Sequence, residues 1–110
     1  MEKIDLQQLT NEQIAFQLIL HSGNARSKVI QSLREYRAGN KEVASKLIEE
    51  AEKDLSLAHD IHFQMIQKEA GGQNTELTLL LMHAEDHFMS TLSMKELVKE
   101  MLELFKERNL

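Results

Sequence analysis

Residues 77–105 read LTLLLMHAEDHFMSTLSMKELVKEMLELF, and mostly apolar side chains recur along this stretch at alternating spacings of three and four. The positions that follow this spacing are Leu77, Leu80, Ala84, His87, Thr91, Met94, Val98, Met101 and Phe105. A repeat sustained over this length is typical of a helix packed in a left-handed bundle. We therefore expect one long helix here, from about residue 75 to residue 106.

The preceding part of the chain predicts two further helices, at about residues 11–38 and 41–70. Thr10 followed by Gln13 is a capping-box pattern that starts the first helix. Gly39 ends this helix and the pair Gly71–Gly72 ends the second, which leaves Asn40 and either Asn74 or Thr75 as the caps of the helices that follow. The expected inner faces are Ile14, Leu18, His21, Ala25, Val29, Leu33 and Tyr36 in the first helix, and Val43, Leu47, Ala51, Leu55, Ala58, Ile61 and Met65 in the second.

The short connections between these helices force neighbouring helices to run antiparallel. The sequence therefore predicts an all-α protein in which residues 1–110 form one domain, an antiparallel up-down-up three-helix bundle. The absence of proline and the abundance of Glu, Lys, Leu, Gln, Ala and Met support this fold class.

Composition excludes several classes of protein. The net charge of −5, with no cluster of Lys or Arg, argues against a nucleic-acid partner. The absence of cysteine removes disulfides, thiolate metal sites and cysteine nucleophiles. The first ten residues do not resemble a signal sequence, and apolar runs are far too short to span a membrane. We expect a cytoplasmic protein with no direct membrane insertion.

The third helix carries more apolar surface than two neighbouring helices can cover. The apolar residues outside its main stripe are Leu79, Leu81, Met82, Phe88, Met89, Leu92, Leu97 and Leu102. The run from Leu79 to Met82 is apolar in every direction, which predicts a segment that is covered on all sides. We therefore expect the chain to self-associate through a second apolar face of this helix.

Three ionisable residues interrupt this apolar helix and are the candidate functional residues: His83, Asp86 and His87. The histidines lie one turn apart on the same face. On the residues alone, three interpretations stay open. His83 is a nucleophile toward phosphorus and His87 stabilises the phosphoryl oxygens; or His83, Asp86 and His87 bind a transition metal; or the histidines are hydrogen-bonded core residues.

The remaining histidines give weaker signals. The zinc-protease pattern His-Glu-x-x-His is not met, because Glu85 is displaced by one position, so a metal-dependent hydrolase is disfavoured. His59 and His62 are three apart, beside Asp60, and such a pair can bind a metal at the surface, but we expect a solvated helix face. His21 lies on the inner face of the first helix, either within the core or beside the candidate residues.

Three segments together resemble the IIA component of the lactose/cellobiose family of the bacterial sugar phosphotransferase system. They are His21–Ser27 (HSGNARS), Gln67–Gly72 (QKEAGG) and His83–Met89 (HAEDHFM), of which the third is the specific one. The resemblance covers nearly the whole chain. It implies a three-helix protomer that assembles as a homotrimer of nine helices, accepts phosphate from the phosphocarrier HPr and passes it to a IIB domain.

The resemblance also implies a role for individual residues. The phosphorylated histidine of the family falls on His83, and the second histidine of its motif falls on His87. The aspartate that members direct at the three-fold axis falls on Asp86, where three copies would hold a divalent cation. Mg²⁺ is the expected ion because hard cations prefer oxygen ligands. Glu85 stands where members often have Gln, and we expect it to point toward solvent.

The expected function is thus that of a phosphotransferase component, a phosphohistidine carrier that serves the uptake of a β-linked disaccharide or oligosaccharide. The resemblance leaves lactose, cellobiose, chitobiose and β-glucan oligosaccharides open as the sugar. The alternative is a non-catalytic trimeric helical interaction module whose histidines are structural. The two differ in one observable property, because only the carrier gains an acid-labile phosphate.

Overall fold

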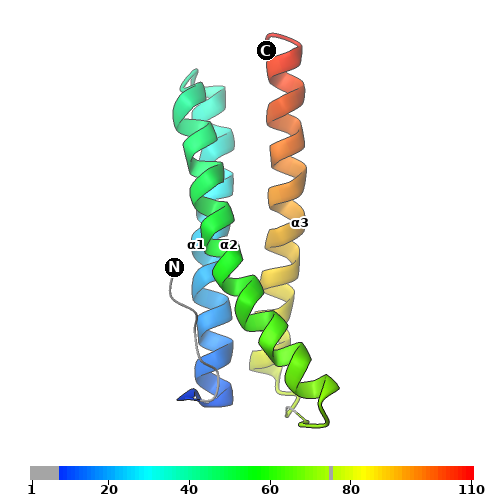
Figure 1. The fold of residues 1–110 in the computed structure, drawn as a ribbon. Coiled ribbons are helices and arrows are strands. Elements are labelled where there is room, and N and C mark those ends of the chain that lie inside the picture. Colours follow the sequence, from blue (N-terminus) through cyan, green and yellow to red (C-terminus); the bar gives the residue numbers. More distant parts are fainter. Residues whose placement is uncertain (1–7, 75) are drawn as a thin grey trace.

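The computed structural model describes residues 8–74 and 76–110, and these residues form three long helices. Helix α1 spans Asn11–Arg37, α2 spans Lys41–Ala70 and α3 spans Leu79–Glu107. The helices run up, down and up in a rod of 51 × 23 × 20 Å (Figure 1). The prediction of an all-α, antiparallel up-down-up protomer is confirmed.

Helix α1 is the element that holds the protomer together. It packs along both other helices, whereas α2 and α3 contact each other much less. Figure 1 shows α1 and α2 side by side near the turn that joins them, while the second half of α2 crosses toward the start of α3. Small side chains allow the close approach of α1 and α2, and the alanines of these helices that are at most 1% exposed are Ala15, Ala25, Ala44, Ala51 and Ala58.

The ends of the helices follow the predicted signals at most positions. The Thr10 side chain accepts a hydrogen bond from the Gln13 backbone, and the Gln13 side chain accepts one from the Thr10 backbone, so the capping box is confirmed. Gly39 has a φ of 93°, a left-handed conformation that a glycine adopts without strain. Asn40 occupies the N-cap position of α2, but its side chain makes no capping hydrogen bond and donates to Glu35 instead.

Helix α3 begins later than predicted. Thr78 is its N-cap, and the Thr78 hydroxyl accepts a hydrogen bond from the Leu81 backbone at 3.1 Å. The proposed cap at Asn74 is therefore wrong, and Thr75 lies outside the described residues. Both Thr78 and the earlier candidates carry side chains that cap helices well, so the sequence alone did not distinguish between them.

The buried stripe of α3 also differs from the predicted one. The residues that face the core are Leu81, Ala84, Phe88, Thr91, Lys95, Val98 and Leu102. Three predicted core positions are shared with this stripe, but Leu77 is 75% exposed and Leu80 and Met94 are only half-buried. Because α3 carries apolar residues around most of its circumference, two stripes of similar quality compete. Packing against the other two helices buries the one that contains Phe88, which is 1% exposed and contacts His59 and His62 of α2.

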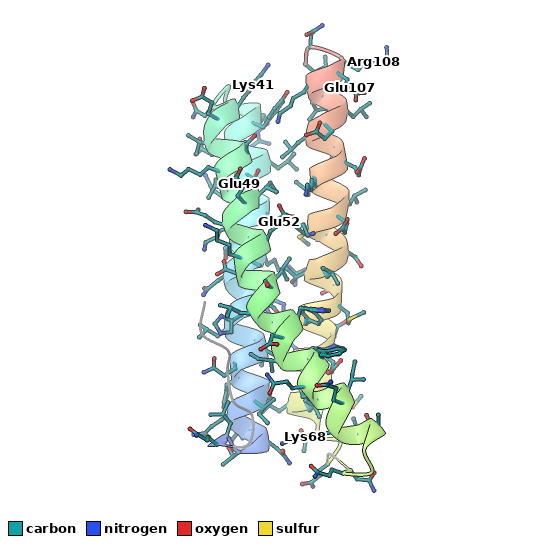
Figure 2. The ribbon with its side chains drawn as sticks, in the orientation of Figure 1. Lys41, Glu49, Glu52, Lys68, Glu107 and Arg108 are labelled. Atoms are coloured by element: carbon teal, nitrogen blue, oxygen red, sulfur yellow. The ribbon has the colours of Figure 1, made fainter. Side chains whose placement is uncertain are left out.

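The burial of a lysine, Lys95, within this stripe is possible because its ammonium group forms ion pairs. The Nζ atom of Lys95 lies 2.6 Å from Glu96 and 3.7 Å from Glu52 of α2, so its alkyl chain is buried while its charge is neutralised. Lys99 binds the same Glu52 carboxylate at 3.0 Å, and Figure 2 shows Glu52 on the side of α2 that faces α3.

Within residues 8–74 and 76–110, no helix is both long and apolar enough to cross a lipid bilayer.

The assignment of Phe88 to the core predicts that two Phe→Ala substitutions lower the free energy of unfolding by different amounts. Phe88→Ala removes a ring that is 1% exposed, and Phe63→Ala removes one that is 50% exposed on α2. We expect Phe88→Ala to lower the free energy of unfolding by about 3–5 kcal/mol. Phe63→Ala should cost roughly 1 kcal/mol or less. Urea unfolding followed by circular dichroism measures both values, and equal losses would show that Phe88 is not a core residue.

Candidate functional site

The three candidate residues lie in the first three turns of α3, on a side of the helix that the protomer leaves open. The side chains of His83 and Asp86 are exposed, and that of His87 is half-buried. The expectation that the preceding segment is covered on all sides is wrong for the single chain. Leu79 is 82% exposed and Met82 is 51% exposed, because α1 and α2 cover only one side of α3.

His83 is available for chemistry. Its ring contacts that of His87, with centroids 6.0 Å apart and planes inclined by 41°. Within the part of the chain that the structure describes, neither ring nitrogen of His83 makes a hydrogen bond. A histidine that serves only the core needs buried partners for its polar atoms. The exposure of His83 therefore disfavours the interpretation of this residue as a structural histidine.

His87 is held more firmly, between α3 and α1. Its Nδ1 atom lies 3.5 Å from the hydroxyl of Thr91, a long contact to a fully buried side chain. On the other side of the ring, a Cβ atom built on Gly23 of α1 would lie 3.6 Å from Nε2 of His87. The absence of a side chain at Gly23 thus lets α1 approach this imidazole closely. The packing fixes the ring of His87 and leaves that of His83 as the freer of the two.

Asp86 is exposed one turn after His83 and forms no metal site within its own chain. Among residues 8–74 and 76–110, no group of three or more His, Asp or Glu side chains is arranged to hold a metal ion. The interpretation of His83, Asp86 and His87 as a metal-binding set of one chain is therefore wrong. These side chains come from little more than one turn of a single helix, and coordination of a metal would need ligands from a second element.

Glu85 does not point into solvent as expected, because it binds a histidine of α2. The Nε2 atom of His62 lies 2.7 Å from Oε2 of Glu85, and the His62 side chain is only 16% exposed. The His62 ring also packs against Phe88, with centroids 5.0 Å apart and planes inclined by 38°. The prediction that His62 is a solvated surface residue is therefore wrong. The histidine and the carboxylate lie 23 positions apart, and no local pattern in the sequence pairs them.

His21 lies on α1 and is half-buried, with its Nε2 atom 3.1 Å from Oε1 of Gln17. Burial lowers the pKa of His21 below its usual value of 6.5, and the negative charge of Asp54 partly opposes this shift. His21 is therefore held toward the neutral form. It is a partly covered polar residue of α1. Its hydrogen bond is with Gln17, whereas the ring of His83 contacts His87.

Comparison with known proteins relates this arrangement to one family. The family described as "PTS system, Lactose/Cellobiose specific IIA subunit" matches residues 13–106. The oligo-β-mannoside-specific EIIA component of Bacillus subtilis (strain 168) is 70% identical over 110 residues, which cover 100% of both chains. The curated relative and the family description thus span the whole bundle, including the start of α3.

Solved structures show the same fold. The cellobiose-specific enzyme IIA from Bacillus anthracis matches with a TM-score of 0.85 and 38% identity, and the match covers 96% of this chain and 97% of that one. The IIA(chitobiose) chain in the IIA(chitobiose)–HPr complex of Escherichia coli matches with a TM-score of 0.78 and 27% identity, and covers 93% of this chain and 99% of that one.

Proposed function

Because the chain belongs to the lactose/cellobiose-specific IIA family of the sugar phosphotransferase system, and is thus a phosphoryl-carrying component, we propose that His83 is the residue that carries the phosphoryl group. The main support for this assignment is the exposure of His83 on the open side of α3. His87, the other candidate, has its ring packed between Thr91 and the backbone of Gly23.

The chemistry requires a neutral imidazole with a free nitrogen lone pair. In the transfer, a nitrogen of His83 attacks phosphorus, the new N–P bond forms, and the bond between phosphorus and the donor breaks. The reverse exchange delivers the group to the acceptor. His87 lies one turn away with its ring 6.0 Å from that of His83. In this position it supports the site by offering an imidazole N–H to the phosphoryl oxygens.

The partners follow from the family and from the structural neighbour. The neighbouring IIA(chitobiose) is in a complex with HPr, which supports HPr as the donor, and a IIB domain is the acceptor that we propose. The relative with 70% identity is specific for oligo-β-mannosides. This favours an oligo-β-mannoside, among β-linked saccharides, as the sugar of the system that this carrier serves. We place the carrier in the cytoplasm, in accord with its lack of cysteine.

We further propose that the protein is a homotrimer whose protomers meet through the open side of α3. The apolar residues of that side are at least 50% exposed in the single chain, and they are Leu79, Met82, Met89, Leu97 and Leu104. A contiguous apolar stripe of this length on a monomer marks an interaction surface. Copies of α3 that pack on one another would cover it and would place His83 in a groove between protomers.

Asp86 lies on the same open side of α3, so the trimer would bring three copies of it together. Three carboxylates within about 4 Å of one another would repel by roughly 4 kcal/mol per pair at an effective dielectric constant near 20. A divalent cation relieves this repulsion, and Mg²⁺ suits a site with oxygen ligands alone. A site shared by three copies would supply the oxygen ligands that a single Asp86 lacks.

Phosphorylation tests the assignment of His83. We incubate the protein with phosphoenolpyruvate, enzyme I and HPr, and we measure acid-labile phosphate by mass spectrometry. The wild type and His87→Gln should be labelled, and His83→Gln should not be, although its circular dichroism should be unchanged because His83 is exposed. His59→Gln, which alters an exposed histidine of α2, is the control. Labelled His83→Gln together with unlabelled His87→Gln would reverse the two roles.

Chelation tests the shared cation. In the wild type, EDTA should shift sedimentation toward smaller species, because the Asp86 carboxylates are then unscreened. Asp86→Asn removes the repulsion, so its trimer should be insensitive to EDTA and should still be phosphorylated on His83. Glu100→Gln, at another exposed acidic residue of α3, should keep the sensitivity of the wild type. A wild-type trimer that EDTA leaves unchanged would contradict the cation site.

A further inference from the structure

A groove between α1 and the last turns of α3 adds a second apolar surface to this end of the protomer. Its volume is about 540 Å³, and its apolar lining includes Ile30 and Leu33 of α1 and Met101 and Phe105 of α3. These four side chains are only partly covered by the rest of the chain. The groove adjoins the open side of α3, so a partner that covers one surface also reaches the other.

Two arginines of α1, Arg34 and Arg37, also line this groove, which we call the arginine groove. Both side chains are exposed. Within residues 8–74 and 76–110, neither guanidinium group forms an ion pair or a hydrogen bond. They concentrate positive charge on one surface of a chain whose net charge is −5. The arginine groove therefore fits a partner surface that is apolar and acidic.

The opposite edge of α3 carries such acidic residues. Lys99, Glu103 and Glu107 are spaced by four and share one side of the helix. Because Lys99 binds Glu52 of α2, this side is the one toward α2. Glu103 has only Lys106 nearby, at 3.9 Å, and Glu107, in the last turn of α3 (Figure 2), has no ion pair among the described residues. We call Glu103 and Glu107 the acidic edge.

The open stripe with Leu97 and Leu104 lies between the arginine groove and the acidic edge, since a helix advances about 100° per residue. In a ring of copies around an axis parallel to α3, rotation turns the groove of each protomer toward the acidic edge of the next. The heights also agree. The ring of Tyr36 lies 5.8 Å from that of Phe105, so the arginines that flank Tyr36 lie within about one helical turn of the level of the acidic edge.

We propose that the arginine groove of each protomer binds the acidic edge of a second copy of this chain. Arg34 and Arg37 then pair with Glu103 and Glu107 of the partner subunit, and the partner covers the apolar lining of the groove. The contact rests on the proposed homotrimer but goes beyond it, because association through the open side of α3 requires nothing of α1. The paired charges give the ring its direction and align the copies along α3.

Reversal of the charges on either surface tests this contact. Arg34→Glu with Arg37→Glu places acidic groups against the acidic edge, and we measure assembly by sedimentation equilibrium at low salt. The concentration at which half of the chains are assembled should rise about tenfold or more, because like charges then face one another. Glu103→Lys with Glu107→Lys should weaken assembly to a similar extent. All four side chains are exposed, so circular dichroism should stay unchanged.

The control is Lys46→Glu with Lys53→Glu, at two exposed lysines of α2. It changes the net charge by the same amount as the arginine reversal but alters neither proposed surface. This variant should assemble like the wild type. An equal loss of assembly in this control would show general charge repulsion and would overturn the proposal.

A chain with all four reversals identifies the pairing. It places opposite charges at every interface again, so its assembly should return to within about threefold of the wild type. If the arginine reversal assembles like the wild type, or if the chain with four reversals is no better than the arginine reversal, the proposal is overturned. A wild type that stays at one chain mass would instead overturn the homotrimer itself, so the two failures are distinguishable.

Discussion

Helix α3 has apolar side chains around most of its circumference, but the chain supplies only two helices to cover it. Packing against the other two helices buries the stripe that contains Leu81, Phe88 and Leu102. The opposite stripe, with Leu79 and Leu97, stays open to solvent. Burial of apolar surface contributes roughly 25 cal/mol per Å², so the open stripe is a strong reason for further association. The burial of one stripe and the exposure of the other decide the environment of each polar residue of α3.

The candidate site also depends on the fact that one side of α3 is buried and the other is exposed. Between His83 and Phe88 the helix turns each side chain into a different environment. His83 and Asp86 face the open side, His87 packs against Gly23 of α1, and Glu85 binds His62 of α2. A polar group thus escapes the cost of burial wherever α3 is uncovered, and has a specific partner wherever α3 is covered.

Local signals in the sequence were sufficient for the helices and for most of their ends, as Thr10 and Gly39 show. They were insufficient where tertiary packing decides between equivalent choices. The stripe with Phe88 and the stripe with Leu80 are both apolar, and only packing against the other two helices selects the first. The candidate residues of α3 were found because polar groups in an apolar helix stand out. The bond between His62 and Glu85 was missed because it joins residues that only the fold brings together.

In the proposed homotrimer, copies of α3 cover one another through its open side, and His83 would lie between protomers. Sedimentation equilibrium of the wild-type protein at micromolar concentration measures this association. We expect a single species of about three times 12.7 kDa, the mass of one chain. A stable species of one chain mass across the same concentrations would contradict it, because the open stripe of α3 would then be ordinary solvent-exposed surface.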